Sequence, residues 1–169
     1  DFCLSRGLGD VYKRQEDCRL FIYSERKLNR IFEIIPESHW FIELTKTVKD
    51  GTSVAVCCGS RCEAQGLYGE VCRCIGGGFT CSSVCFTSTM DDATMAAQMA
   101  SINDTFANAK FITYTSKISV GVDIVTPVGK MFVLPSLLAT PPREMYQMVC
   151  RVRNLMDKFV PVCDRGPQL

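Results

Sequence analysis

The chain has no long apolar run, and this absence bears on where it can reside. No stretch approaches the roughly 18–20 apolar residues that a bilayer-spanning helix needs. No N-terminal stretch has the charged-then-apolar order of a signal peptide. The 169 residues are 47% hydrophobic and 22% charged, which is typical of one globular domain. We therefore expect an intracellular protein that is neither secreted nor embedded in a membrane.

An excess of charge of one sign is also absent. Lysine and arginine together number 19, and aspartate and glutamate number 18, so the net charge is +1. A domain that binds nucleic acid through its overall charge is strongly basic. Any nucleic-acid binding must therefore come from a local patch or from a partner domain.

Histidine is nearly absent, since His39 is the only one among the 169 residues. A cysteine nucleophile would thus have a single imidazole partner to choose from. The 11 cysteines are an odd number, and without a secretory signal they favour a reducing compartment over a disulfide framework.

Several cysteines lie close together in the sequence and leave a zinc site open as an alternative. They are Cys57, Cys58, Cys62, Cys72, Cys74, Cys81 and Cys85. Thiolates are good zinc ligands, but no C-x-x-C pair occurs, and free cysteine also packs as a small hydrophobe. We assign no metal ligands.

No phosphate-binding loop of the form G-x-x-x-x-G-K-[ST] is present. Gly129-Lys130 is followed by Met131, and IGGGF (75–79) contains no lysine. No Asp-Glu pair follows an apolar strand to hold Mg²⁺. The sequence therefore predicts no complete nucleotide-hydrolysing site within this chain.

The N-terminal residues differ in character from the rest. The stretch GLGDVYKRQ resembles translated sequencing-adapter sequence found at the ends of proteins predicted from environmental DNA. We interpret residues 1–15 as an artefact outside the fold, residues 16–35 as a linker or remnant of an upstream region, and residues 36–164 as the domain. On this interpretation the chain is a fragment of a longer protein.

Strand-like and helix-like patterns alternate along the chain. Strands are expected at 53–58, 83–88, 110–115 and 130–136, with RLFIY (19–23) as a further edge strand or remnant. Helices are expected from Ser38 as N-cap to a stop at Gly51, over 61–74, from Asp92 to Phe106, and from Pro141-Pro142 onward. This order predicts an α/β fold with a parallel sheet and helices on both faces. Its chemistry is expected at the carboxyl ends of the strands.

The last helix carries YQMVCRVRN (146–154). In a regular helix, Met148, Val152 and Leu155 form the buried stripe, while Gln147 and Arg151 share another face. Arginine suits phosphate because its guanidinium is planar, bidentate and always protonated. The alternative is a solvated polar face with no chemistry.

The segment TSKISVGVD (115–123) follows a predicted strand. Thr115 and Ser116 offer hydroxyls and backbone amides that can hold a phosphate, and Gly121 allows close backbone approach. Asp123 can accept hydrogen bonds from a sugar hydroxyl or pair with an arginine. The alternative is a turn with a capping aspartate.

Taken in order, WFIEL (40–44), TSKISVGVD and QMVCRVRN resemble the C-terminal motifs of superfamily 2 helicases. The resemblance covers roughly residues 36–156 and is closest to the origin-of-replication-binding helicases of herpesviruses and large DNA viruses. It implies a three-layer RecA-like fold of the P-loop NTPase type. It also implies catalytic roles for Arg151, as arginine finger, and for Gln147 and Arg153.

The resemblance further implies nucleotide contacts by Gly121 and Asp123. It places Thr115, Ser116, Ser60 and Arg61 against the backbone of DNA, with RNA left open. ATP and Mg²⁺ would be bound mainly by an upstream RecA-like domain of the same parent chain, so that this chain alone does not hydrolyse ATP. Cys150 stands where most family members have glycine. A zinc-stabilised interaction module and a degenerate RecA-like scaffold remain alternatives.

Overall fold

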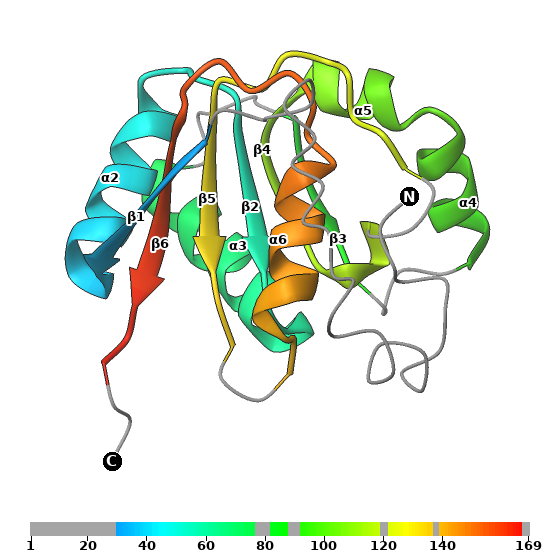
Figure 1. Ribbon diagram of the computed structural model, residues 1–169. Helices are drawn as coiled ribbons and strands as arrows, with labels where there is room; N and C mark the ends of the chain where they lie inside the picture. The colour runs from blue at the N-terminus through cyan, green and yellow to red at the C-terminus, as the bar shows by residue number, and fades with distance from the viewer. Residues whose placement is uncertain (1–29, 77–81, 88–91, 119–121, 137–138, 167–169) are drawn as a thin grey trace, which may run out of the picture.

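A six-stranded sheet forms the centre of the computed structural model (Figure 1). The structure describes residues 30–76, 82–87, 92–118, 122–136 and 139–166. All neighbouring strands run parallel, in the order β1-β6-β5-β2-β4-β3. The strands are β1 (Ile31–Pro36), β2 (Val54–Cys58), β3 (Ser82–Phe86), β4 (Ala109–Tyr114), β5 (Lys130–Leu134) and β6 (Phe159–Asp164).

Helices cover both faces of this sheet. The helices are α2 (Glu37–Lys49), α3 (Arg61–Ile75), α4 (Asp92–Ala100), α5 (Ile102–Asn108) and α6 (Pro142–Cys150), with a 3₁₀ turn η3 (Ser116–Ile118). One apolar cluster joins the sheet to α2 and α3, and a second joins its other face to α5 and α6. Figure 1 shows α6 in front of the sheet and α3 behind it. The predicted α/β fold with helices on both faces is confirmed.

Strand β2 shows why both faces must be covered. All five of its residues are buried, and successive side chains of a strand point to opposite faces. Val54, Val56 and Cys58 pack in the cluster with α2 and α3, whereas Ala55 and Cys57 pack with α5 and α6. A strand that is apolar at every position is typical of the interior of a parallel sheet.

Trp40 fixes helix α2 on the sheet. Its side chain is 1% exposed, and its indole Nε1 donates to the carbonyl oxygen of Pro161 on β6 at 3.2 Å. Its ring meets the ring of Phe132 on β5 edge-on, with centroids 5.6 Å apart. A buried tryptophan with its N–H satisfied contributes both apolar area and orientation.

The edge strand β1, its neighbour β6 and several boundaries differ from the sequence-based expectation. Residues 31–35, expected as part of a linker, belong to β1, which pairs with β6 from Ile31↔Phe159 to Pro36↔Asp164. Every residue of β1 is at least partly exposed, so it lacks the apolar run that marks a central strand. The segment RLFIY (19–23) lies outside the described residues.

The predicted helix boundaries are partly confirmed. Helix α2 begins at Glu37 after Pro36, so Ser38 lies inside the helix and is not its N-cap. Gly51 follows the helix end with φ of +80°, as a stop residue does. The expected helix from Asp92 to Phe106 is two helices, α4 and α5, separated at Ser101. Within the described residues, no helix is both long and apolar enough to cross a bilayer.

Gly59 is required for the close approach of two loops, and this generates a prediction. A Cβ added at Gly59 would lie 2.3 Å from the backbone N of Ser136, whereas one added at Gly66 in α3 meets nothing within 4 Å. We expect Gly59→Ala to lower the free energy of unfolding by about 1–3 kcal/mol through overpacking. Gly66→Ala should raise it by about 0.5–1 kcal/mol through helix propensity. Urea denaturation followed by circular dichroism measures both, and equal effects would contradict the assigned contact.

Candidate functional site

Helix α6 ends at Cys150, so the expected regular helix through Leu155 is wrong. Arg151 is its C-cap, with φ of −72° and ψ of −27°. Beyond it the chain runs alongside residues 124–128, through the parallel bridges Ile124↔Val152 and Val128↔Leu155. Val152 is still buried, but its place in the core comes from this pairing and not from a helical stripe.

Groups from other parts of the chain bond the carbonyls at the end of α6. The hydroxyl of Tyr114 donates to the Met148 carbonyl oxygen at 3.2 Å, and burial keeps that hydroxyl protonated by raising the pKa of Tyr114. The Arg30 guanidinium donates to the carbonyl oxygens of Val149 and Val152. The backbone N of Ile124 donates to the Arg151 carbonyl oxygen at 2.9 Å. These bonds satisfy carbonyls that a helix end leaves without partners.

The pairing places two arginines on one carboxylate. Arg153 donates to Asp123 Oδ1 from Nε at 3.1 Å and from Nη2 at 2.9 Å. Arg151 Nη1 lies 3.7 Å from the same oxygen. The side chains of Arg151, Arg153 and Asp123 are 27%, 40% and 55% exposed, respectively. The arginine partner that the sequence suggested for Asp123 is therefore present, and two guanidiniums share it.

Arg30 is a third cation, close enough to Arg153 for the two charges to interact. Burial lowers the pKa of Arg30 from its ordinary value, and the positive charge of Arg153 lowers it further. We call Arg30, Arg151, Arg153 and Asp123 the arginine cluster. The formal charges of these four side chains sum to +2, with Arg151 and Arg153 paired to Asp123. Such a cluster attracts anions, and its exposed part is open to a phosphate.

The arginine cluster lies at the amino edge of the sheet. Helix α6 starts after the carboxyl end of β5 and returns, so its last residue is beside the strand starts. Figure 1 shows the strands pointing downward and the chain after α6 crossing the top. The expectation that Asp123 and the arginines sit at the carboxyl ends of the strands is therefore wrong, because a crossover helix carries its C-terminus to the opposite edge.

Of the other residues expected in catalysis or nucleotide binding, Gln147 lies on α6 close to the arginine cluster. Gln147 is exposed on α6, one turn before Arg151. Gly121 lies outside the described residues. Cys150 is half-buried, and its hydrogen bond with Tyr146 raises the pKa of the Tyr146 phenol.

Four predicted nucleic-acid contacts lie at the carboxyl edge. Ser60 is the N-cap of α3, and its Oγ accepts from the backbone N of Glu63 at 3.3 Å. Arg61 is the exposed first residue of α3. Thr115 is only 7% exposed, and its hydroxyl donates to the carbonyl oxygen of Phe86 at 3.5 Å. Ser116 begins η3 and is half-buried. The structure thus gathers these residues at one edge, away from the arginine cluster.

Lys130 and the cysteines give no sign of further chemistry among the described residues. Lys130 Nζ lies 2.7 Å from Glu43 and 3.2 Å from Asp157, so both carboxylates neutralise it. No group of three or more histidine, cysteine or acidic side chains in the described segments could hold a metal ion. Cys81, one of the cysteines considered for zinc, lies outside the described residues.

Sequence reasoning missed Arg30. It stands directly before an edge strand, in a segment interpreted as a linker, and no motif marks it. It caps the end of α6 by bonding the carbonyls of Val149 and Val152, which lie 119 and 122 residues further along the chain. Only the paired arrangement of β1 and β6 brings it there.

No protein-family model matches the sequence, and no curated protein matches it. The structure is similar to the helicase MrfA bound to DNA, with a TM-score of 0.61 at 10% identity over 80% of this chain and 19% of that one. It is also similar to a variant of S. cerevisiae Dbp5 bound to RNA and ADP BeF3, with a TM-score of 0.58 at 16% identity over 82% of this chain and 36% of that one.

A third similar structure is the Mycobacterium smegmatis helicase Lhr bound to ssDNA and AMP-PNP. Its TM-score is 0.57 at 13% identity, over 80% of this chain and 19% of that one. The chain thus spans between 19% and 36% of the length of these three structures. At such low identities the similarity establishes the fold, which is RecA-like α/β.

The Arg30 bonds generate a second prediction. We expect Arg30→Ala to lower the free energy of unfolding by about 1–3 kcal/mol, because it leaves the carbonyls of Val149 and Val152 without their donor. Arg73→Ala is the matched control, since among the described residues exposed Arg73 bonds only the Gly69 carbonyl of its own helix, and its effect should stay within about 0.5 kcal/mol. Denaturant titration compares the two. A loss for Arg30→Ala no larger than the control's would contradict the capping role.

The buried thiols generate a third prediction. Burial raises the pKa of Cys163 to about 11 and raises that of Cys57 and Cys58 as well. Because the thiolate is the reactive form, iodoacetamide at pH 8 should alkylate the exposed Cys62 and Cys74 well before these three. Peptide mass spectrometry after timed labelling measures the order. Alkylation of Cys163 as fast as that of Cys62 would show that its thiol is not shielded.

Proposed function

We propose that this chain is the C-terminal RecA-like domain of an ATP-dependent DNA helicase of superfamily 2, of the type that binds replication origins. The observation that carries the proposal is the pair Arg151 and Arg153 on the single carboxylate of Asp123, partly exposed at the end of α6. The RecA-like fold and the order of the three sequence motifs support it. The DNA-bound structures of MrfA and Lhr have the same fold.

Arg151 is the arginine finger in this proposal. Its backbone is held by hydrogen bonds to Met148 and Ile124. In the described part of the chain its guanidinium makes one ion-pair contact, the long one of 3.7 Å to Asp123. A partly exposed ion pair of this kind contributes at most about 1 kcal/mol. The guanidinium can therefore turn to a phosphate at little cost and neutralise the charge that develops during hydrolysis.

The other members of the site support Arg151. Arg153 makes the shorter contacts to Asp123 and holds that carboxylate in place. Gln147 positions nucleotide or water from the adjacent turn of α6, and Asp123, with Gly121, faces the ribose. ATP supplies the phosphate on which these groups act, and the exposed guanidiniums fit it. An upstream RecA-like domain of the parent chain holds most of the ATP and the Mg²⁺.

Nucleic acid contacts the opposite edge of the sheet in this proposal. Arg61 and Ser116 are accessible there, and Ser60 orders the start of α3. Thr115, with its hydroxyl on Phe86, positions the loop after β4 and offers a phosphate its small exposed part. Contacts of this kind read the phosphate backbone and not the bases, so they bind without sequence preference.

The test is Arg151→Ala in the parent helicase. We expect at least a 10³-fold loss of kcat for ATP hydrolysis, the lower range for an arginine finger, with nucleotide binding largely intact. A phosphate-release assay measures kcat, and fluorescence of a labelled ATP analogue measures binding. Arg73→Ala removes the same charge from an exposed helix position and should leave both unchanged. Near-normal turnover in Arg151→Ala would overturn the assignment.

A further expected outcome concerns the chain by itself. Because it has no phosphate-binding loop, the purified 169-residue chain should hydrolyse no ATP above the protein-free background. Recovery of the upstream coding sequence offers an independent check. A G-K-[ST] loop and an acidic metal-binding pair there would support the proposal, and their absence would favour a scaffold without catalytic activity.

A further inference from the structure

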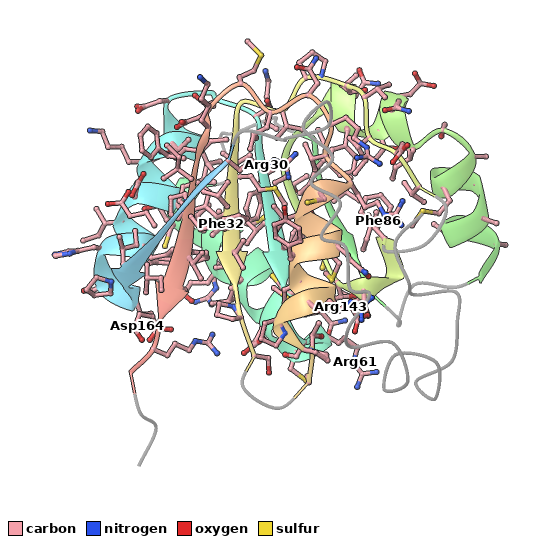
Figure 2. The ribbon with its side chains drawn as sticks, viewed as in Figure 1. Arg30, Phe32, Arg61, Phe86, Arg143 and Asp164 are labelled. Carbon is pink, nitrogen blue, oxygen red and sulfur yellow. The ribbon has the colours of Figure 1, made fainter. Side chains whose placement is uncertain are left out.

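Two exposed arginines stand at the carboxyl edge on opposite faces of the sheet. Arg61 opens α3 on one face, and Arg143 is the second residue of α6 on the other. Figure 2 shows both at the lower edge of the molecule. Arg143 belongs to none of the motifs considered so far.

Both guanidiniums are free of ion pairs within the described residues. Arg165 at the same edge differs, because Glu37 and Glu63 both pair with it. An exposed arginine without a counter-charge is available to an external anion.

The loops that carry the two arginines touch each other. Their strands, β2 and β5, are neighbours, with Cys58 opposite Leu134. Gly59 approaches the backbone of Ser136 so closely that a side chain there would collide with it. Thr140 Oγ1 donates to the Gly59 carbonyl oxygen at 2.5 Å. Arg61 is two residues beyond Gly59, and Arg143 is three residues beyond Thr140, so both lie within a few residues of one shared contact.

The described residues that make the contact between the two loops, Gly59, Ser136 and Thr140, are small or polar. Gly59 has no side chain, and Ser60 and Ser136 are half-buried. The hydroxyls of these serines can accept or donate hydrogen bonds. The cavity beside this junction is lined mainly by apolar side chains, among them Phe32, Val133 and Met145, so it does not suit an anion. The exposed edge itself suits an extended polyanion lying across it.

We propose that Arg143 and Arg61 together bind the phosphate backbone of one nucleic-acid strand that crosses the carboxyl edge from the α3 side to the α6 side. The proposal rests on the proposed function and adds Arg143 to its nucleic-acid surface. The strand then contacts both ends of the β2–β5 junction. It stays well apart from the arginine cluster, which lies at the other end of α6.

The test measures binding of a fluorescein-labelled oligothymidylate to the 169-residue chain by fluorescence anisotropy between 20 and 200 mM salt. Each lost phosphate contact on a single strand should reduce the slope of log K against log salt by about 0.7. We expect this reduction for Arg143→Gln and for Arg61→Gln, and about twice that for the double variant. Arg143→Lys keeps the charge and should keep most of the slope.

Arg73→Gln is the matched control. Arg73 is an exposed arginine in the last turn of α3, far from the carboxyl edge, and its loss changes the net charge equally. If Arg143→Gln behaves like Arg73→Gln while Arg61→Gln weakens binding, Arg143 is not a contact, and the proposed function still stands. If the unsubstituted chain does not bind at 20 mM salt, both proposals are overturned. Thermal melts confirm that each variant is folded.

Discussion

The complete burial of strand β2 is the constraint on which the rest of this structure depends. Its five residues send apolar side chains to both faces, so neither face of the sheet can be left to water. Parallel neighbours follow, and each neighbour must be reached by a crossover that returns the chain to the strand starts. Loops therefore meet at two opposite edges of the sheet. The arginine cluster forms at one edge, and Arg61 and Arg143 lie at the other.

The central part of the fold could be predicted from the sequence because its signals are local. SVAVCC between two glycines, and KMFVL after Gly129, are short apolar runs that have few alternatives to a buried strand. The edge strand β1 was missed because Glu33 interrupts its apolar residues, and its neighbour β6 was missed because a proline interrupts its apolar run. At an edge, pairing with a distant segment decides the structure, and a local pattern does not record that pairing.

The candidate site divides in the same way. Arg151 and Asp123 could be singled out by residue type and order, and they do lie together. The end of α6 could not be predicted, since the residues after Cys150 are compatible with a helix. The helix stops where Tyr114 and Arg30 donate to the carbonyls of Met148, Val149 and Val152. The wrong edge for the arginines has a separate cause, since a crossover helix carries its C-terminus to the amino edge of the sheet. A helix end that depends on donors far away in the sequence is set by tertiary structure, so the local apolar periodicity cannot predict it.

Helix α6 has nine residues and is about 13 Å long at 1.5 Å per residue. Arg143 stands in its first turn, and Arg151 follows its last residue. One residue inserted between them would advance the second arginine by about 1.5 Å and turn it by about 100° around the axis. Its guanidinium would then leave Asp123 even if every other contact survived. In evolutionary terms, the exposed positions of α6 other than Arg143 and Gln147 are free to change identity, whereas the helix tolerates neither insertion nor deletion.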